Sequence, residues 1–508
     1  MTDETTFTLD GREVTAPVAP GGATLLEALR ALGVRSAKDG CSPQGQCGCC
    51  TVWVDGQPRV ACVTPVARVA GRVVTTLEGI PEIAADWAGR LCDAGGSQCG
   101  FCTPGIIMRL AAIPEDRRTD ASVRQALLAH LCRCTGWQTV VEAALAPPRP
   151  PVGWGRHADP AAVRAEMEAG VPQTVSPAVA LGDGGFAADT APPDALIAVR
   201  DASGGWAVAE TLTEARLASG KVQGRRTTEP LRWPIDLPDG DWVRTLQTTW
   251  VEPAYLEPDA AWCEPGGDPV GPAGNGGAFG GKGASPVAEA ARRLADKHGR
   301  TVLAVLSRED VVRLGPKRPP IAAGVRADGT GVVRVARTAG IAEAIRSVAP
   351  GLVVEEVDVA GPPTSAELRA AGWAEAAVLL APDDGWITAP GGGRAQASID
   401  DDGTVRVQVE CGPEGDPVVL RSYCIGAAHM ALGWVRSEGI AVDEAGEPLD
   451  LTIRSFGILR AVDMPRVEVT VRNTDGRRRN GSDAVFAAVA LAAWRASGCA
   501  PRWPTMRA

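Results

Sequence analysis

The residues best suited to chemistry are cysteines, and they are concentrated in the first quarter of the chain. Ten of the 14 cysteines lie between Cys41 and Cys134. Disulfide scaffolds are typical of short secreted domains, whereas Met1 to Asp10 is acidic and polar where a signal peptide is basic and then apolar. Thiols clustered in a long chain of this kind favour metal binding. The later cysteines are expected to be ordinary buried thiols: Cys263, Cys411, Cys424 and Cys499.

The first group of cysteines lies in a glycine-containing loop, GCSPQGQCGCCTV, followed by one more cysteine. A [2Fe–2S] cluster takes four thiolates, commonly three from one tight loop and one from a distant strand. Cys41, Cys47, Cys50 and Cys62 fit this arrangement, with one residue more between the first two than the plant-type spacing has. Cys49 is then a spectator or an alternative ligand. A structural zinc site is the competing interpretation, because four thiolates also bind zinc.

The second group consists of two close pairs separated by segments with helical periodicity, 106–112 and 121–131. Two such pairs at neighbouring helix ends can meet around a second metal centre, because helix N-termini favour thiolates. A redox dithiol formed by the first pair alone is the alternative. The pairs are Cys99 with Cys102 and Cys132 with Cys134.

Together, GCSPQGQCGCCTVWVDG, QCGFCTPG and LCRCTG closely resemble the iron–sulfur subunit or domain of the molybdenum hydroxylases, the family of xanthine dehydrogenase, aldehyde oxidase and carbon monoxide dehydrogenase. The resemblance covers residues 1 to about 145. It implies a β-grasp ferredoxin domain over 1–78 and a four-helix domain over 79–145, each with one [2Fe–2S] cluster. It also implies that Gln98 and Cys134 face the pterin of a molybdenum cofactor. The implied cluster ligands are Cys41, Cys47, Cys50 and Cys62, then Cys99, Cys102, Cys132 and Cys134.

Local patterns position these cysteines on elements that agree with the resemblance. Residues 7–14 predict a β-hairpin, with a turn at Asp10 and Gly11. Residues 24–32 predict a helix. The proline-rich segment 146–176 predicts a linker, interrupted by a short helix over 160–169. The whole chain is therefore expected to be an α+β multidomain protein.

A glycine-rich motif, GNGGAFGGK at 274–282, is the one chemical signal in the second half. Glycines before a helix can hold phosphate, and Gly276, Gly281 and Lys282 match the P-loop pattern G-x4-G-K. The following Gly283 lacks the hydroxyl that a P-loop needs for magnesium. A nucleotide triphosphatase is therefore disfavoured.

The same motif resembles the GGxFGGK loop of the molybdopterin-binding subunit of the same family. Residues 177–508 accordingly resemble a shortened, reduced α/β version of that subunit, about half its usual length. The resemblance implies that Gly277, Phe279, Gly280 and Gly281 line a cofactor pocket. It also places Asp483 where the family has its catalytic glutamate. Aspartate reaches one methylene less far, and a misplacement near 1 Å can cost on the order of a hundredfold in rate. The region is expected to be either cofactor-free packing or a cofactor site of its own.

The composition limits the remaining function classes. The chain has 508 residues, a net charge of −10 and 45% hydrophobic residues, which favours two to four domains. The net acidity argues against nucleic-acid binding. The sequence contains no run of about 18 apolar residues, which a membrane-spanning helix would need. We therefore expect a cytoplasmic protein.

These observations predict an electron-transfer subunit of a molybdenum-hydroxylase-type oxidoreductase. Its clusters would pass electrons from a molybdenum site to flavin or another acceptor. No flavin-binding segment is visible, so FAD would lie on a partner, and a hetero-oligomer with a molybdopterin catalytic subunit and an FAD subunit is expected. Two alternatives stay open: an autonomous molybdopterin-dependent hydroxylase, and a structural or assembly protein that retains its clusters.

Overall fold

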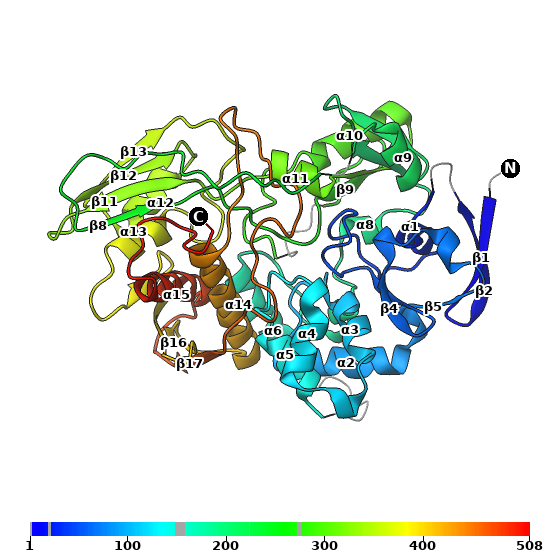
Figure 1. Ribbon diagram of the computed structural model, residues 1–508, viewed down its shortest axis with the longest axis horizontal. Helices are drawn as coiled ribbons and strands as arrows, with labels where there is room; N and C mark the ends of the chain where they lie inside the picture. Colours follow the sequence, from blue (N-terminus) through cyan, green and yellow to red (C-terminus); the bar gives the residue numbers. More distant parts are fainter. Residues whose placement is uncertain (1–2, 19–21, 148–157, 223, 272–276, 508) are drawn as a thin grey trace.

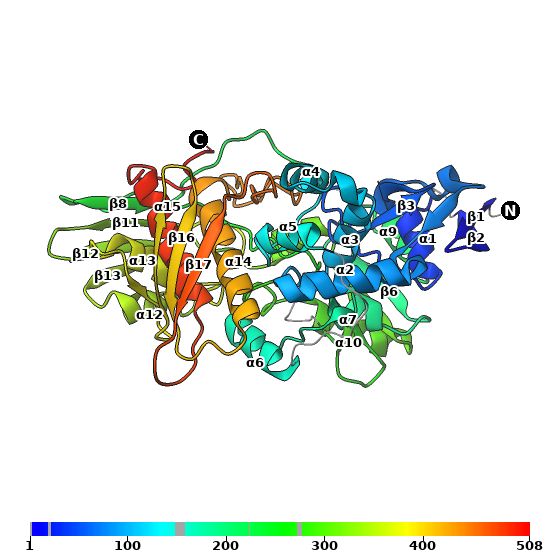
Figure 2. The same ribbon diagram turned by 90° about the horizontal axis from the view of Figure 1, so that it is seen from below.

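The computed structural model describes residues 3–18, 22–147, 158–222, 224–271 and 277–507. It is elongated, with the N-terminal sheet at one end and the sheet containing β8 and β11 to β13 at the other (Figure 1). Helix α14 lies between them, beside the helices of residues 79–145 (Figures 1 and 2). The N-terminal and C-terminal halves of the chain therefore share a long interface.

The first domain is a five-stranded sheet in the order β2-β1-β5-β3-β4, packed against one helix. The predicted hairpin is confirmed, because β1 and β2 pair antiparallel around Asp10 and Gly11, which both have positive φ. The predicted helix is confirmed as well, and Thr24 caps its N-terminus. The elements are β1 Asp3–Leu9, β2 Arg12–Val18, α1 Leu25–Ala31, β3 Thr51–Val54, β4 Gln57–Val60 and β5 Val73–Thr75.

Four helices form the second domain, as the resemblance implies. The helix predicted over 121–131 ends early: α4 stops at Ala126, a 3₁₀ turn covers Leu127–Ala129, and His130 is extended. The cause is a tertiary contact, because the Leu131 amide donates to Cys47 in the first domain instead of continuing a helix. The helices are α2 Pro81–Ala94, α3 Thr103–Ala111, α4 Asp120–Ala126 and α5 Gln138–Leu145.

The predicted short helix of the linker is present as α6, Ala158–Ala169, and begins two residues earlier than predicted. It is packed into the molecule, since Ala161 and Ala165 are buried against Val419 and Tyr423 of α14. The proline-rich residues 148–157 lie outside the described residues. Short helices α7 Pro177–Ala180 and α8 Ala187–Thr190 follow.

In the described part of residues 177–508, the strands form three four-stranded sheets with the orders β7-β6-β10-β9, β13-β12-β11-β8 and β14-β15-β16-β17. Their strands are β6 Leu196–Arg200, β7 Trp206–Ala209, β8 Arg244–Gln247, β9 Ala260–Cys263, β10 Val302–Val305, β11 Ile321–Val325, β12 Gly331–Ala336, β13 Leu352–Val357, β14 Ile387–Thr388, β15 Arg394–Ile399, β16 Val405–Glu410 and β17 Val467–Arg472. Their helices are α9 Leu212–Ala218, α10 Val287–His298, α11 Arg308–Leu314, α12 Ile341–Val348, α13 Trp373–Leu379, α14 Pro417–Arg436 and α15 Ser482–Ala496.

Helix α14 is the centre of the C-terminal core. Among the described residues, it is the one helix long and apolar enough to cross a membrane, but 89% of its apolar window is buried inside the protein. It packs against α15, where the Trp434 and Phe486 rings stack with centroids 5.2 Å apart. One prediction about the thiols of this region is wrong: Cys499 is exposed, because it follows the end of α15, whereas Cys263, Cys411 and Cys424 are buried as expected.

Candidate metal centres

The first four predicted ligands lie together in the first domain. Cys41, Cys47, Cys50 and Cys62 are each at most 2% exposed. Backbone amides point at their sulfurs: Gln44 N lies 3.2 Å from Cys41 Sγ, and Cys62 N lies 3.4 Å from Cys50 Sγ. Such N–H groups stabilise negative charge on thiolates, and the loop is therefore preorganised for metal.

The pKa values of these thiols show how closely they are packed. Hydrogen bonds from the Cys47 and Cys62 thiols hold the pKa of Cys41 well below its usual range. The hydrogen bond to Cys41, together with burial, raises the pKa of Cys47 and of Cys62. Not all of these thiols can ionise together at neutral pH without a cation. Metal binding at this site must therefore release protons.

Cys49 is also fully buried, and its sulfur lies beside that of Cys47. Its thiol lies 3.9 Å from the Cys47 carbonyl. Burial and the neighbouring Cys41, Cys50 and Cys132 raise its pKa, against the effect of its hydrogen bond with Cys47. Cys49 therefore lies between the two groups of thiols.

The second four predicted ligands form two pairs. Each pair combines one cysteine of the Cys99 and Cys102 motif with one cysteine of the Cys132 and Cys134 motif. The sulfurs of Cys99 and Cys134 are 3.6 Å apart. A hydrogen bond from the Cys102 thiol lowers the pKa of Cys132 to about 6. Cys102 is the N-cap of α3, where the partial positive charge of a helix favours thiolates.

The arrangement in pairs bears on the choice between iron and zinc. Among the residues that the structure describes, no three His, Cys, Asp or Glu side chains converge where one metal ion could bind. A [2Fe–2S] cluster needs two thiolates on each iron, whereas a structural zinc ion needs four around one point. At the second site, the pairs Cys99 with Cys134 and Cys102 with Cys132 match the two-iron requirement.

Hydrogen bonds join the ligand segments of the two groups of thiols. The backbone N–H of Leu131, next to Cys132, donates to the Cys47 carbonyl at 3.0 Å. His130 fills the neighbouring space, with its Nε2 3.2 Å from Thr51 Oγ1. Burial lowers the pKa of His130 to about 3, so it is neutral at physiological pH.

The C-terminal region closes over the second group. Gln98 donates from Nε2 to the Cys134 carbonyl at 3.0 Å and to Ser422 Oγ of α14 at 2.9 Å. A Cβ added at Gly426 of α14 would lie 1.8 Å from the Cys134 carbonyl oxygen. Helix α14 therefore lies directly on the Cys132 to Cys134 loop.

The glycine loop lies beside the same thiols. Gln98, Cys99, Cys134, Gly277 and Phe279 line one narrow space. A second cavity of about 480 Å³ is lined by Phe279, Gly280, Glu168, Arg369, Asn480 and Asp483, among others. Gly281 does not line either space, because it faces the ring of Tyr255.

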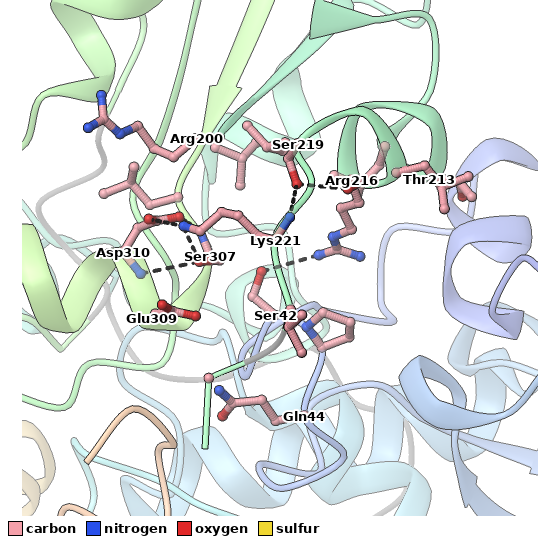
Figure 3. Close-up of a pocket in the computed structure, with 18 of the residues that line it drawn as sticks. Ser42, Gln44, Arg200, Thr213, Arg216, Ser219, Lys221, Ser307, Glu309 and Asp310 are labelled. Carbon is pink, nitrogen blue, oxygen red and sulfur yellow. Dashed lines mark hydrogen bonds and ion pairs between the residues drawn. The ribbon is translucent and has the colours of Figure 1, made fainter. Parts of the chain in front are cut away.

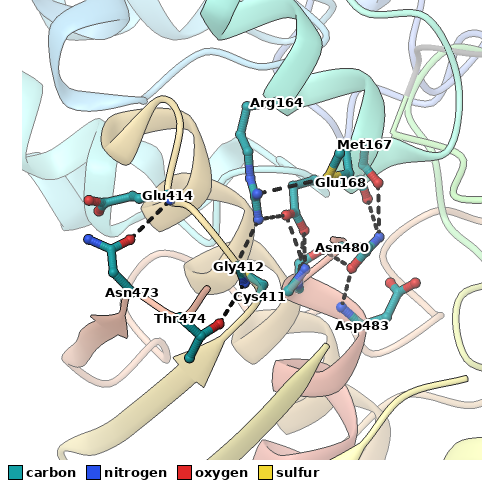
Figure 4. A network of polar contacts seen from close by, with 12 residues as sticks. Arg164, Met167, Glu168, Cys411, Gly412, Glu414, Asn473, Thr474, Asn480 and Asp483 are labelled. Carbon is teal, nitrogen blue, oxygen red and sulfur yellow. Dashed lines mark hydrogen bonds and ion pairs between the residues drawn. The ribbon is translucent and has the colours of Figure 1, made fainter. Parts of the chain in front are cut away.

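Asp483 lies in the first turn of α15, where Figure 4 shows it beside Asn480, and Arg369 binds its carboxylate. Arg369 Nε donates to Asp483 Oδ1 at 3.0 Å, and Nη2 donates to Ser482 Oγ at 2.8 Å. Burial raises the pKa of Asp483, while the charge of Arg369 acts in the opposite direction. The predicted proton acceptor is therefore engaged in an ion pair.

A carboxylate from α6 occupies the N-terminus of α15 (Figure 4). Glu168 accepts from the amides of Gly481 at 3.1 Å and Ser482 at 2.8 Å, and it forms an ion pair with Arg164. Both side chains of the ion pair are fully buried. Sequence reasoning missed Glu168 and Arg369; the spacing of Arg164 and Glu168 on one helical face was the available signal for the former.

A further pocket, of about 300 Å³, opens beside the first group of thiols (Figure 3). Ser42, Pro43 and Gln44, which follow Cys41, form one wall. Arg216 of α9 reaches this wall from the C-terminal region. The pocket therefore lies next to the loop that carries Cys41.

Comparison with known proteins identifies the N-terminal part. Residues 2–79 match the model of a 2Fe-2S iron-sulfur cluster binding domain, and residues 76–145 match that of a [2Fe-2S] binding domain. The xanthine dehydrogenase iron-sulfur-binding subunit of Escherichia coli O157:H7 is 38% identical over 148 residues, which is 27% of this chain and 89% of that subunit. The chain belongs to the molybdenum hydroxylase family.

Within the molybdenum hydroxylase family, the sequence match is confined to one segment. The xanthine dehydrogenase of Emericella nidulans is 38% identical over 156 residues, which cover 28% of this chain and only 11% of that enzyme. The fold likeness extends further. Aldehyde oxidoreductases from Desulfovibrio gigas and Desulfovibrio desulfuricans superpose with TM-scores of 0.67 and 0.66, at 15% identity, over 99% and 97% of both chains. The predicted multidomain α+β fold is confirmed.

The two kinds of cofactor known from the resemblance fit this molybdenum hydroxylase chain differently. Eight buried thiols in two groups of four, with amides aimed at sulfur in the first group, fit two [2Fe–2S] clusters. The described residues of the glycine loop do not fit a pterin. A Cβ at Gly280 would lie 2.0 Å from the Glu367 carbonyl, and the Phe279 ring is covered by the Arg369 guanidinium, 3.9 Å from its centroid. At these two positions the loop is therefore in contact with other parts of the chain, and the cavity of about 480 Å³ lies beside it.

Proposed function

We propose that this chain carries single electrons through two [2Fe–2S] clusters, as the electron-transfer subunit of a molybdenum-hydroxylase-type oxidoreductase. The observation that carries this proposal is the hydrogen bond from Leu131 to Cys47, since it joins the ligand loops of the two sites. The proposed ligands are Cys41, Cys47, Cys50 and Cys62 for the first cluster, and Cys99, Cys102, Cys132 and Cys134 for the second.

When bound, the clusters supply reversible one-electron chemistry. The residues of the chain control where that chemistry happens. The amides of Gln44 and Gln46 donate to Cys41 Sγ and favour the more negative, reduced state. Burial of all eight thiols excludes water. The Leu131 amide and the Cys47 carbonyl provide a short bonded path between the sites.

We further propose that the molybdopterin and FAD sites lie on partner subunits in a hetero-oligomer. The poor fit of the glycine loop to a pterin supports this proposal, as does the relative from Escherichia coli, which is itself an iron-sulfur-binding subunit. In this proposal the C-terminal region packs against the cluster domains and holds no molybdenum. The cytoplasm is the proposed compartment, because iron–thiolate centres need reduced cysteines.

Metal analysis of the purified full chain tests the proposal. We expect about four iron and four acid-labile sulfide per chain, two paramagnetic species after dithionite reduction, and molybdenum and flavin near zero. Zinc without sulfide would refute the clusters. Molybdenum near one per chain would instead identify an autonomous hydroxylase. Clusters that no substrate reduces in the native complex would point to a structural or assembly protein.

A further inference from the structure

Three arginines of the C-terminal region bind the loop that carries the first cluster's ligands. Each donates to a residue next to a cysteine: Arg308 Nη2 to the Gly40 carbonyl at 2.7 Å, Arg216 Nη2 to Ser42 Oγ at 3.2 Å, and Arg454 Nε to the Gln46 carbonyl at 2.9 Å. Arg216 lies on α9 and Arg308 on α11. Three separate segments therefore bring positive charge to one loop.

The three charges differ in how far they are compensated. Arg216 forms ion pairs with Glu27 at 3.1 Å and with Asp39 at 2.7 Å. Arg454 is exposed, so water and salt screen its charge. Arg308 is fully buried and has no ion-pair partner among the described residues. Its charge is therefore the least compensated of the three.

The surroundings of Arg308 compensate its charge only in part. Its Nε and Nη1 atoms have no hydrogen-bond partner among the described residues, and its guanidinium lies 5.9 Å from the centroid of the Tyr255 ring. Two of the neighbouring buried carboxylates, Glu252 and Glu257, are ion-paired with Lys317 and Lys282. The third, Asp259, acts on the same Tyr255 hydroxyl as Arg308 does and partly compensates its charge. In a poorly polarisable interior, an uncompensated charge acts over a longer distance than at the surface.

Resting on the proposed function, we propose that Arg308 raises the reduction potential of the first cluster. An electron added to the cluster makes the site more negative. A buried cation stabilises that state when it is bound to the Gly40 carbonyl, next to the ligand Cys41. The C-terminal region then has a role beyond packing, because its buried charge makes the first cluster easier to reduce. Arg308 is a positioning residue for charge, since it contacts the ligand loop and not the iron.

A redox titration of the full, cluster-loaded chain, followed by electron paramagnetic resonance, tests this inference. At fixed solution potential, Arg308→Gln is expected to lower the ratio of reduced to oxidised first cluster about tenfold, equivalent to about 59 mV for one electron. Arg308→Lys keeps the charge and is expected to keep most of the ratio. The second cluster is expected to titrate as in the unaltered protein.

Arg337→Gln is the matched control, because Arg337 is exposed, lies after β12 and pairs with Asp358 at 2.6 Å. It is expected to change neither cluster. An unchanged first-cluster ratio in Arg308→Gln, or an equal change in both clusters, overturns the inference. Absence of iron and sulfide in the unaltered chain would instead overturn the proposed function.

Arg454→Gln keeps the inference testable if Arg308→Gln does not fold. Its exposed charge predicts a smaller shift in the same direction, about twofold at low salt, which disappears at 1 M salt because the screening length falls to about 3 Å. In that case, no shift at low salt overturns the inference.

Discussion

Substitution of Gly105 by alanine tests how tightly the two cluster domains are packed. Gly105 is the third residue of α3 and lies against the ligand loop of the first site. A Cβ at this position would lie 2.3 Å from the Gly48 carbonyl oxygen and 3.0 Å from Cys49 Cα. Ordinary carbon–oxygen contacts need about 1 Å more, so the domains must move apart. Overpacking of this kind costs about 1–3 kcal/mol.

Gly89→Ala is the control for the intrinsic effect of alanine. Gly89 lies within α2, and an added Cβ there meets nothing within 4 Å. Alanine in place of glycine inside a helix stabilises by about 0.5–1 kcal/mol. We therefore expect Gly89→Ala to raise the free energy of unfolding and Gly105→Ala to lie about 1–3 kcal/mol below it.

Denaturant titrations of both variants, followed by the visible absorbance of the clusters, measure this difference. Gly105→Ala is also expected to slow electron equilibration between the two clusters, because the wedge separates Leu131 from Cys47. Equal stability of the two variants would refute the close packing of α3 against the ligand loop, and with it the short path that the proposed function needs.

Three further outcomes are expected. Cys62→Ser should leave about two iron per chain, whereas Cys49→Ser should keep about four, by iron and sulfide analysis; loss of iron from the Cys49 variant would make it a ligand. His130 has a pKa of about 3 in the folded chain, below its unfolded value, so its contribution to stability is present above pH 6.5 and is lost as pH falls. The free energy of unfolding should therefore drop between pH 8 and pH 5 by about 2 kcal/mol less in His130→Asn than in the unaltered chain, as measured by denaturant titration. Glu168→Gln leaves the buried Arg164 without an anion and should cost about 3 kcal/mol of unfolding free energy without changing iron content.

The N-terminal domains could be predicted well because their signals are local. The Asp10 and Gly11 turn fixes the hairpin, and Thr24 caps a helix whose periodicity is visible in the sequence. The helix predicted through Leu131 was too long, because helical propensity carries no information about a hydrogen bond to Cys47, more than 80 positions away. The family resemblance supplied the assignment of four cysteines to each cluster, which spacing alone left open.

The C-terminal region was harder to predict, because its polar contacts join distant segments. Sequence placed Asp483 in a catalytic position, but its partner Arg369 lies 114 positions earlier. The resemblance implied that Gly280 and Gly281 line a cofactor pocket. Gly280 lines the cavity of about 480 Å³ but also abuts the Glu367 carbonyl, and Gly281 abuts Tyr255. A glycine in the sequence indicates that another group can approach the backbone closely. It does not indicate whether that group is a ligand or another part of the chain.

The position of α14 over the Cys132 to Cys134 loop has a consequence for biosynthesis. All eight proposed ligands are at most 5% exposed, and α14 comes from residues that the ribosome makes nearly 300 positions after Cys134. Domains fold in order as the chain emerges. Iron and sulfide are therefore expected to reach the second site before α14 docks. Once folded without iron, the chain should take up the second cluster only after partial denaturation, which iron uptake with and without dilute urea would show.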